Sequence, residues 1–210
     1  MIKKHLKILT VTSLAILLPI LVGVLLWDQL PQQLPIHWNM AGEIDDWCSK
    51  PFAVFGMPAI LLAVQFVAVL AMEVDPKKKN HTDKMKQLSF WLVPVVSIAL
   101  SAITYSTAMG MEAPIEMCTP LLMGMLFVIV GNYLPKCKQN YTVGIKISWT
   151  LNSEENWNKT HRLAGWLWVV CGLLIMLSAF FSTLWVMLAA PLVMVLIPII
   201  YSYLLYRKGI

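Results

Sequence analysis

Six long apolar segments follow one another along the chain and are separated by shorter polar ones. They cover residues 8–27, 52–72, 88–109, 118–134, 163–181 and 184–206. A helix needs about 20 apolar residues to cross the hydrocarbon core of a bilayer, so each segment is long enough, or nearly so, to span a membrane. The pattern predicts an all-α fold: a polytopic membrane helix bundle with six transmembrane helices, forming one transmembrane domain over residues 1–210.

The first and the last of these segments carry further information. The first is longer than the apolar region of a usual signal peptide, and no small-x-small cleavage site follows it, so we expect a retained helix. The last two segments are separated by only a few residues around Ser182. We expect them to form a tight helical hairpin.

Composition supports a membrane protein. Hydrophobic residues make up 59% of the chain and charged residues only 13%, whereas soluble domains are about half apolar and a quarter charged. A soluble core of this size could not hide the excess apolar surface, so we expect lipid to be the surrounding solvent.

The distribution of basic residues predicts the orientation. Of the 16 lysines and arginines, all except Lys50 lie before the first segment, after the sixth, or in the second and fourth connections. Short basic loops stay in the cytoplasm, which predicts that both termini are cytoplasmic. The net charge of +5 therefore reflects membrane orientation, and we expect no nucleic-acid partner.

The connection over residues 27–51, the predicted outer loop, concentrates polar and aromatic side chains. Pro31 and Pro35 forbid a regular helix across its first half, and Gly42 supplies a turn. The polar-aromatic group comprises His37, Trp38, Asn39, Asp45 and Trp47. These residues are either interfacial anchors or an outward-facing recognition site. A metal site lacks ligands, because the other histidines fall on the predicted cytoplasmic side.

The connection over residues 135–162, the predicted inner loop, changes its period part of the way along. Apolar and polar residues alternate over 141–151, which predicts a half-buried strand that must lie on another surface. Asn152 or Ser153 can then cap a helix. Glu155 and Lys159 are placed for an ion pair within that helix, which we expect to continue without a break into the fifth span.

The same helix predicts a stripe formed by Trp157, His161, Ala164 and Trp168. The neighbouring Thr160-His161-Arg162 is either a polar collar at the membrane edge or part of a docking surface. In the second interpretation, the cytoplasmic pocket or docking surface is formed by Trp149, Trp157, His161 and Arg162.

The interiors of the spans are almost free of ionisable side chains, and Gln65 is their clearest polar residue. Coupled ion transporters usually bury carboxylates or arginines on the pathway. Pro94, Pro191 and Pro198 would bend the third and sixth spans, which is a weak indication of a transport path. The chain has no GxSxG elbow, HExxH helix or P-loop, so we predict no enzyme, no catalytic residue and no cofactor.

At its two long loops the chain resembles the SdpI family of bacterial membrane proteins. The outer loop is similar to the family pattern Leu-Pro-x-x-x-Pro-x-His-Trp-Asn-x-x-Gly-x-x-Asp. The matching residues are Leu30, Pro31, Pro35, His37, Trp38, Asn39, Gly42 and Asp45, followed by Ser49 and Lys50.

The inner loop resembles the second signature of the family. The matching residues are Gly131, Asn132, Pro135, Lys136, Asn140, Tyr141, Gly144, Ile145, Trp149, Thr150, Leu151, Ser153, Glu154, Trp157, Thr160, His161, Arg162 and Gly165. Family members often carry Gly-Ile-Arg-Thr-Pro-Trp-Thr, whereas this chain has Lys146, Ile147 and Ser148 before Trp149. Lysine keeps the charge but loses the planar fork of arginine, so a bidentate contact at Lys146 is not expected.

The resemblance covers nearly the whole chain and implies a division into two parts. Residues 1–75 hold two spans and the outer loop, and residues 118–210 hold the part most similar to SdpI, with the inner loop over 135–162. It implies a multi-pass protein of the bacterial plasma membrane that gives immunity to a secreted peptide toxin. Its implied partners are membrane lipid, the toxin or another envelope ligand, and a soluble cytoplasmic repressor held at the membrane.

The resemblance and the residue pattern together give two candidate sites. The outer loop would recognise the ligand through His37, Trp38, Asn39, Gly42 and Asp45. The inner loop would form the docking surface or pocket through Asn132, Asn140, Lys146, Trp149, Thr150, Trp157, His161 and Arg162. The predicted strand would offer an edge for capturing the repressor by strand addition.

Two other functions are compatible with the sequence. A transporter for a small peptide or lipid-like compound would need a polar cavity that includes Gln65. A membrane enzyme would need His37 within hydrogen-bond reach of Asp45. The sequence also leaves open whether Cys48 and Cys118 form a disulfide.

Overall fold

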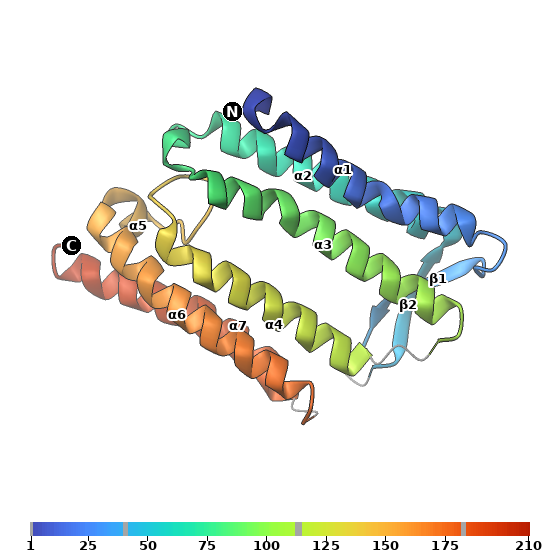
Figure 1. The fold of residues 1–210 in the computed structure, drawn as a ribbon. Helices are drawn as coiled ribbons and strands as arrows, with labels where there is room; N and C mark the ends of the chain where they lie inside the picture. Colours follow the sequence, from blue (N-terminus) through green and yellow to red (C-terminus); the bar gives the residue numbers. More distant parts are fainter. Residues whose placement is uncertain (1, 40–41, 112–114, 182–183) are drawn as a thin grey trace. The chain divides into compact units, whose positions relative to one another are not determined.

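The computed structural model describes residues 2–39, 42–111, 115–181 and 184–210. Within them, 6 helices are long and apolar enough to cross a membrane, as the hydrophobic pattern predicted (Figure 1). These helices are α1 (Ile2–Leu25), α2 (Met57–Val74), α3 (Asp83–Ala108), α4 (Ile115–Tyr133), α6 (Glu154–Ser178) and α7 (Leu184–Arg207). The chain is therefore a polytopic α-helical membrane protein.

Shorter elements connect these helices. A two-stranded sheet is formed by β1 (Gln33–Trp38) and β2 (Ile44–Ser49). The π-helix η1 (Phe52–Gly56) leads into α2, the 3₁₀ turns η2 (Lys78–Asn80) and η3 (Leu134–Lys136) follow α2 and α4, and α5 (Ser148–Asn152) precedes α6.

Helix α6 begins well before its apolar segment because its first turn is capped. The Ser153 hydroxyl accepts a hydrogen bond from the Asn156 amide at 3.2 Å, which satisfies one of the amides left free at a helix start. Glu155 and Lys159 form the predicted ion pair, with 2.7 Å between Oε1 and Nζ. Of the two predicted caps, Asn152 and Ser153, the structure uses Ser153, and the predicted uninterrupted run into the fifth span is confirmed.

The chain divides into two compact units. Unit 1 comprises Met1–Glu73 and Lys86–Ile115, and therefore contains α1, the sheet and most of α2 and α3. Its helices are joined by buried polar contacts: Gln65 Nε2 donates to Thr12 Oγ1 at 2.9 Å, and the Tyr105 hydroxyl donates to the Pro19 carbonyl at 3.1 Å. The hydrophobic effect does not drive helices together in lipid, so interhelical hydrogen bonds such as these contribute to their association.

Unit 2 comprises Val74–Met85 and Glu116–Ile210. Its helices α4 and α6 approach closely at two places, where a glycine of one helix faces a glycine of the other. On each helix the two glycines are seven residues apart. A Cβ on Gly124 would lie 2.5 Å from the Gly172 carbonyl oxygen, and one on Gly165 would lie 2.8 Å from the Gly131 carbonyl oxygen. Small residues at such positions let two membrane helices pack backbone to backbone.

Candidate functional site

The predicted outer loop is folded into a β-hairpin, which the sequence pattern did not reveal. Strands β1 and β2 are antiparallel and pair Leu34 with Cys48 and Trp38 with Ile44, with irregularities on either side of His37. The buried side of β1 rests on unit 1, where Leu34 joins a cluster with Leu30, Ala53, Val54 and Tyr105. The hairpin, residues 33–39 and 42–49, is thus fixed on one face and open on the other.

The open face carries the predicted recognition residues. His37 Nδ1 and Asp45 Oδ1 lie 2.5 Å apart, with 66% and 42% of the two side chains exposed. Asn39 accepts a hydrogen bond from the Glu43 amide at 3.0 Å and donates one to the Glu43 carboxylate at 3.0 Å. Gly42, with φ of 77°, supplies the turn.

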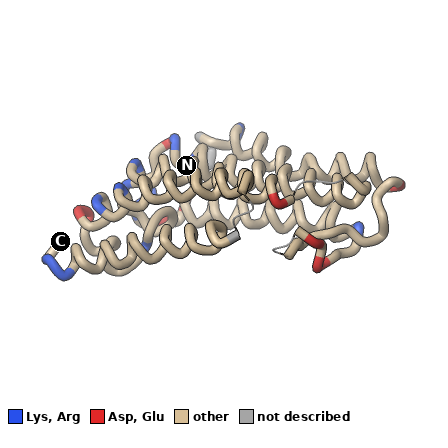
Figure 2. Tube along the Cα trace, turned by 90° about the horizontal axis from the view of Figure 1, so that it is seen from below, with Lys and Arg blue, Asp and Glu red and all other residues tan. Residues whose placement is uncertain are grey.

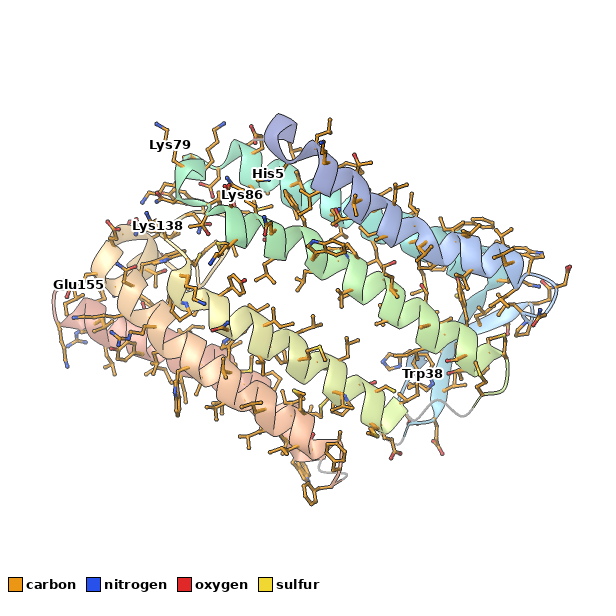
Figure 3. All side chains as sticks on the ribbon, in the orientation of Figure 1. His5, Trp38, Lys79, Lys86, Lys138 and Glu155 are labelled. Atoms are coloured by element: carbon orange, nitrogen blue, oxygen red, sulfur yellow. The ribbon has the colours of Figure 1, made fainter. Side chains whose placement is uncertain are left out.

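Trp38 completes this set at the end of β1. It is partly buried and lies at the end of unit 1 opposite His5 (Figure 3). The hairpin therefore brings the predicted recognition residues together on one short element, and its cross-strand pair meets the geometric condition set above for acid–base chemistry.

Lys50 follows the hairpin and is 5% exposed. Its ammonium group donates to the carbonyl oxygens of Leu30 at 2.7 Å and Trp27 at 3.0 Å, and it lies 5.0 Å from the centre of the Trp27 ring. Sequence reasoning treated Lys50 as an exception to the charge pattern and as a match to the family pattern, and assigned it no contacts. Its isolation among the basic residues was the signal that it has a structural role.

The strand predicted over 141–151 is wrong. Residues 141–147 are bends and coil, and α5 begins at Ser148. Gly144 has φ of 123°, which interrupts an extended run. The alternating apolar residues are buried against separate partners: Val143 and Leu151 pack on the cluster around Trp157, and Trp149 lies 5.1 Å from the Tyr203 ring. No strand edge is present in this described segment for strand addition.

Residues 137–147 are called here the braced loop. Their backbone is held by hydrogen bonds from side chains, where a strand would be held by backbone hydrogen bonds to a neighbouring strand. Asn140 is fully buried. Its Nδ2 donates to the carbonyls of Lys138 and Val143 at 2.8 and 2.9 Å, and its Oδ1 accepts from the amides of Thr142 and Val143 at 2.8 and 2.7 Å. One asparagine thereby satisfies backbone groups that a strand would have paired.

Thr150 continues this bracing at the start of α5. Its hydroxyl donates to the Ile145 carbonyl at 2.7 Å, and its own carbonyl accepts from Gln139 Nε2 at 2.7 Å. The side chain of this residue is buried, so it is placed to shape the loop and is not available at the surface.

Trp157 and His161 of α6 are buried and contact the backbone of the braced loop. Their rings stack with centroids 3.9 Å apart, and Trp157 Nε1 donates to the Cys137 carbonyl at 2.7 Å. His161 Nε2 accepts from the Ile145 amide and its Nδ1 faces the Trp157 carbonyl, both at 2.9 Å. A donor on one side and an acceptor on the other fix the neutral imidazole with its proton on Nδ1.

Asp75 ties the α2–α3 connection to the braced loop. Its Oδ2 accepts from the Thr142 hydroxyl at 2.6 Å, the Tyr141 amide at 2.9 Å and His81 Nε2 at 3.2 Å. The side chains of Asp75 and His81 are both 0% exposed. Burial raises the pKa of the Asp75 carboxyl, but the hydrogen bonds led by that of Thr142 outweigh it and hold the pKa below 3.8.

The remaining predicted docking residues lie at the surface. Asn132, Lys146 and Arg162 are exposed, and Trp149 is partly buried. Lys146 Nζ donates to the Thr142 carbonyl at 2.8 Å. The predicted inner site is therefore divided: Asn140, Thr150, Trp157 and His161 hold the loop from inside, and the other four residues face outward.

Sequence reasoning missed Asp75, His81 and Gln139. A signal for Asp75 was present, since this acid follows the second span directly and precedes Pro-Lys-Lys-Lys. Gln139 bonds to the side chain of Lys77, and its carbonyl accepts from Asn80 Nδ2 at 2.7 Å. Nothing in the local pattern indicated that Gln139 and His81 would be buried.

Charged residues are unevenly distributed in unit 2. Figure 2 shows basic residues at the end that carries the C-terminus. Lys79, Lys138 and Glu155 all lie at this end of unit 2 (Figure 3). The cysteines Cys48, Cys118, Cys137 and Cys171 are free thiols, so the structure contains no Cys48–Cys118 disulfide.

These features define a class: a multi-pass α-helical membrane protein with a β-hairpin on one unit and a side-chain-braced loop on the other. The SdpI/YfhL protein family matches residues 136–202, and a domain of unknown function, DUF1648, matches residues 14–62. The Immunity protein SdpI of Bacillus subtilis (strain 168) is 27% identical over 203 residues, which cover 94% of this chain and 95% of that protein. No solved structure matches the chain. The chain is thus similar to the SdpI family in its C-terminal part and to one SdpI protein along nearly its whole length.

Proposed function

We propose that this protein is a membrane immunity protein, which protects the cell that makes it from a secreted peptide toxin. One observation carries the proposal: the likeness to Immunity protein SdpI extends over 94% of this chain and 95% of its relative. A match of that extent includes both long loops as well as the apolar helices. Similarity of the helices alone would carry little weight, because every membrane-spanning helix is apolar.

The hairpin is the proposed recognition element. It is a two-stranded platform whose open face displays His37, Asn39 and Asp45, while its other face is packed on the buried cluster of unit 1. Ligand-binding residues on a loop are most effective when a rigid scaffold holds them. Catalysis is not part of the proposal, because His37 and Asp45 are exposed partners that stabilise the hairpin as a cross-strand pair.

Complementation tests this proposal. A Bacillus subtilis strain lacking its own SdpI would express this chain, the His37→Ala/Asp45→Ala variant or the Glu155→Ala/Lys159→Ala variant at equal membrane levels. The last is a matched control, since it also removes an exposed pair of polar side chains. We expect wild type and control to restore growth in medium conditioned by the parent strain. Cells that express the hairpin variant should be killed at a toxin concentration at least tenfold lower. Failure of the wild type to protect, or full protection by the hairpin variant, would contradict the proposal.

The proposed orientation places the hairpin outside the cell and both termini in the cytoplasm. The asymmetry of the basic residues supports it, and the one basic residue on the hairpin side, Lys50, is buried against carbonyl oxygens. We expect a membrane-impermeant maleimide to label an Asp46→Cys variant in intact cells, and a Lys146→Cys variant only after permeabilisation. The opposite pattern would reverse the topology.

A relay to gene expression is the finer part of the proposal. Lys138 and Lys146 are exposed on the braced loop and would hold a soluble repressor at the membrane by charge. We expect Lys138→Glu with Lys146→Glu to abolish the transcriptional response to toxin while leaving the protein in the membrane. An unchanged response would rule out docking through these two lysines.

A further inference from the structure

Helix α2 is the element that leads from the hairpin to the connection held by the braced loop. Its helical run follows directly on Lys50, through the π-helix Phe52–Gly56 and then Met57–Val74. Short π-helical stretches often occur at functional sites, where an extra residue is accommodated in a helix. The residue after Val74 is Asp75, so both ends of the run meet a buried charged side chain.

The outer anchor of this run is Lys50. Its ammonium group is buried and donates to the carbonyls of Trp27 and Leu30, beyond the last turn of α1. A buried ammonium without a carboxylate depends on such contacts to offset its desolvation. Moving the start of the run away from these carbonyls would therefore carry a large cost.

The inner anchor is Asp75. Its carboxylate accepts from the Lys77 amide at 2.7 Å and from Tyr141 and Thr142 of the braced loop. His81 also depends on it, because Nδ1 of that buried imidazole has no hydrogen-bond partner and Nε2 bonds only to Asp75 in the described contacts. Releasing Asp75 would leave buried polar groups unpaired on both segments.

The contacts continue from this anchor to the surface. Thr142, held by Asp75 through its hydroxyl, accepts from Lys146 Nζ through its carbonyl at 2.8 Å. The Thr142 amide donates to Asn140, whose Nδ2 lies 3.3 Å from the Cys137 sulfur. A displacement at Asp75 thus reaches the exposed lysine through Thr142, and the buried thiol through Thr142 and Asn140.

We infer that α2 couples the hairpin to the braced loop, with Lys50 as its outer anchor and Asp75 as the residue that positions the loop. This inference deepens the proposed function, on which its biological meaning rests, by assigning the element that carries a binding event from one loop to the other. Coupling of this kind is reciprocal, so loosening either anchor changes the stability of the loop at the far end.

Cys137 is a native reporter of the braced loop. It is 3% exposed, and its sulfur donates to the Val143 carbonyl at 3.3 Å. Burial raises the pKa of its thiol to about 11, although the hydrogen bond from Asn140 opposes this. Because the thiolate is the reactive form, Cys137 should react with a water-soluble maleimide only when the loop opens.

The experiment measures the rate of Cys137 labelling by mass spectrometry in the full-length protein in lipid nanodiscs, without toxin. The variants are Asp75→Asn, Lys50→Met and their combination, with Asp83→Asn and Lys79→Met as controls that change exposed charges. Thr142→Val replaces Asp75→Asn if the latter does not reach the membrane. Labelling of Cys171, buried with Ile175 and Met194, reports opening of the whole unit.

We expect Asp75→Asn to accelerate Cys137 labelling at least tenfold and Lys50→Met at least threefold, with Cys171 and both controls unchanged. In the combined variant, Lys50→Met should add nothing, because its effect passes through Asp75. Independent effects that multiply, no effect of Lys50→Met, or equal acceleration at Cys171 would each overturn the inference. Since no toxin is used, the outcome is separate from that of the complementation assay.

Discussion

The hairpin and the braced loop are both irregular connections rich in polar residues, yet they hold their shapes by different means. In the hairpin the backbone of β1 pairs with that of β2, and polar side chains such as His37 and Asp45 remain exposed. In the braced loop buried side chains, above all Asn140 and Asp75, take the place of a partner strand.

This difference teaches where mutations should harm folding and where they should harm function alone. A side chain that pairs buried backbone leaves several unsatisfied groups when it is removed. An exposed side chain on a paired backbone leaves none, because water replaces its partner. Substitutions in the braced loop should therefore lower the free energy of unfolding. Substitutions on the open face of the hairpin should leave it almost unchanged and weaken ligand recognition instead.

The largest effect is expected from Gly144→Ala in the braced loop. A Cβ there would lie 2.5 Å from His161 Nε2 and 3.0 Å from the Trp157 ring, at a φ of +123°. We expect a loss of about 3 kcal/mol, from strain and from the broken contact between His161 and Ile145. Equilibrium unfolding in mixed micelles with increasing dodecyl sulfate, followed by tryptophan fluorescence, measures it.

Gly110→Ala is the matched control for this strain. Gly110 has φ of +79°, and no atom lies within 4 Å of its hypothetical Cβ. It should lose only about 1 kcal/mol, the cost of a left-handed backbone for alanine. Equal losses at the two glycines would show that crowding beneath the braced loop does not contribute.

The next effect compares two asparagines. Asn140→Ala removes four backbone hydrogen bonds from a fully buried site and should cost about 3 kcal/mol. Asn39→Ala removes two exposed contacts to Glu43 and should cost about 1 kcal/mol or less. The same unfolding measurement tests both, and a hairpin variant as damaging as Asn140→Ala would remove the proposed distinction.

The two regions also differ in how far the sequence predicts them. The six spans and the capped start of α6 depend on local pattern: apolar length, and a serine followed by the Glu155–Lys159 pair. The hairpin was missed because β1 contains Pro35, β2 carries two aspartates, and their register is irregular. The alternation over 141–151 wrongly predicted a strand, because its apolar residues are buried against different parts of unit 2 and do not form one face. The role of Asp75 could not be predicted despite its position beside a lysine run, because its partner Thr142 is 67 residues away in the sequence.

Acid should weaken the braced loop through Asp75. The pKa of Asp75 is lowered below 3.8 in the folded protein, chiefly because hydrogen bonds led by that of Thr142 outweigh the effect of burial. The ionised form is thus favoured by folding, so its contribution is complete above the unfolded pKa and is lost as pH falls through the folded value. We expect a steeper fall in unfolding temperature below pH 4 for wild type than for Asp75→Asn. Parallel curves would show that Asp75 is not the titrating group.

The smallest expected effect is at the pair His37–Asp45, where the stability and recognition roles of the hairpin can be separated. Exposed ion pairs contribute little, because water and salt screen them and two side chains must be ordered. A double-mutant cycle of His37→Ala and Asp45→Ala should give a coupling free energy of about 0.5 kcal/mol in the same unfolding assay. Loss of toxin protection alongside so small a coupling would assign the pair to recognition, since the folded fraction would be almost unchanged. A coupling above about 2 kcal/mol would mean that the pair holds the hairpin together, and the hairpin would then resemble the braced loop in depending on its side chains for its shape.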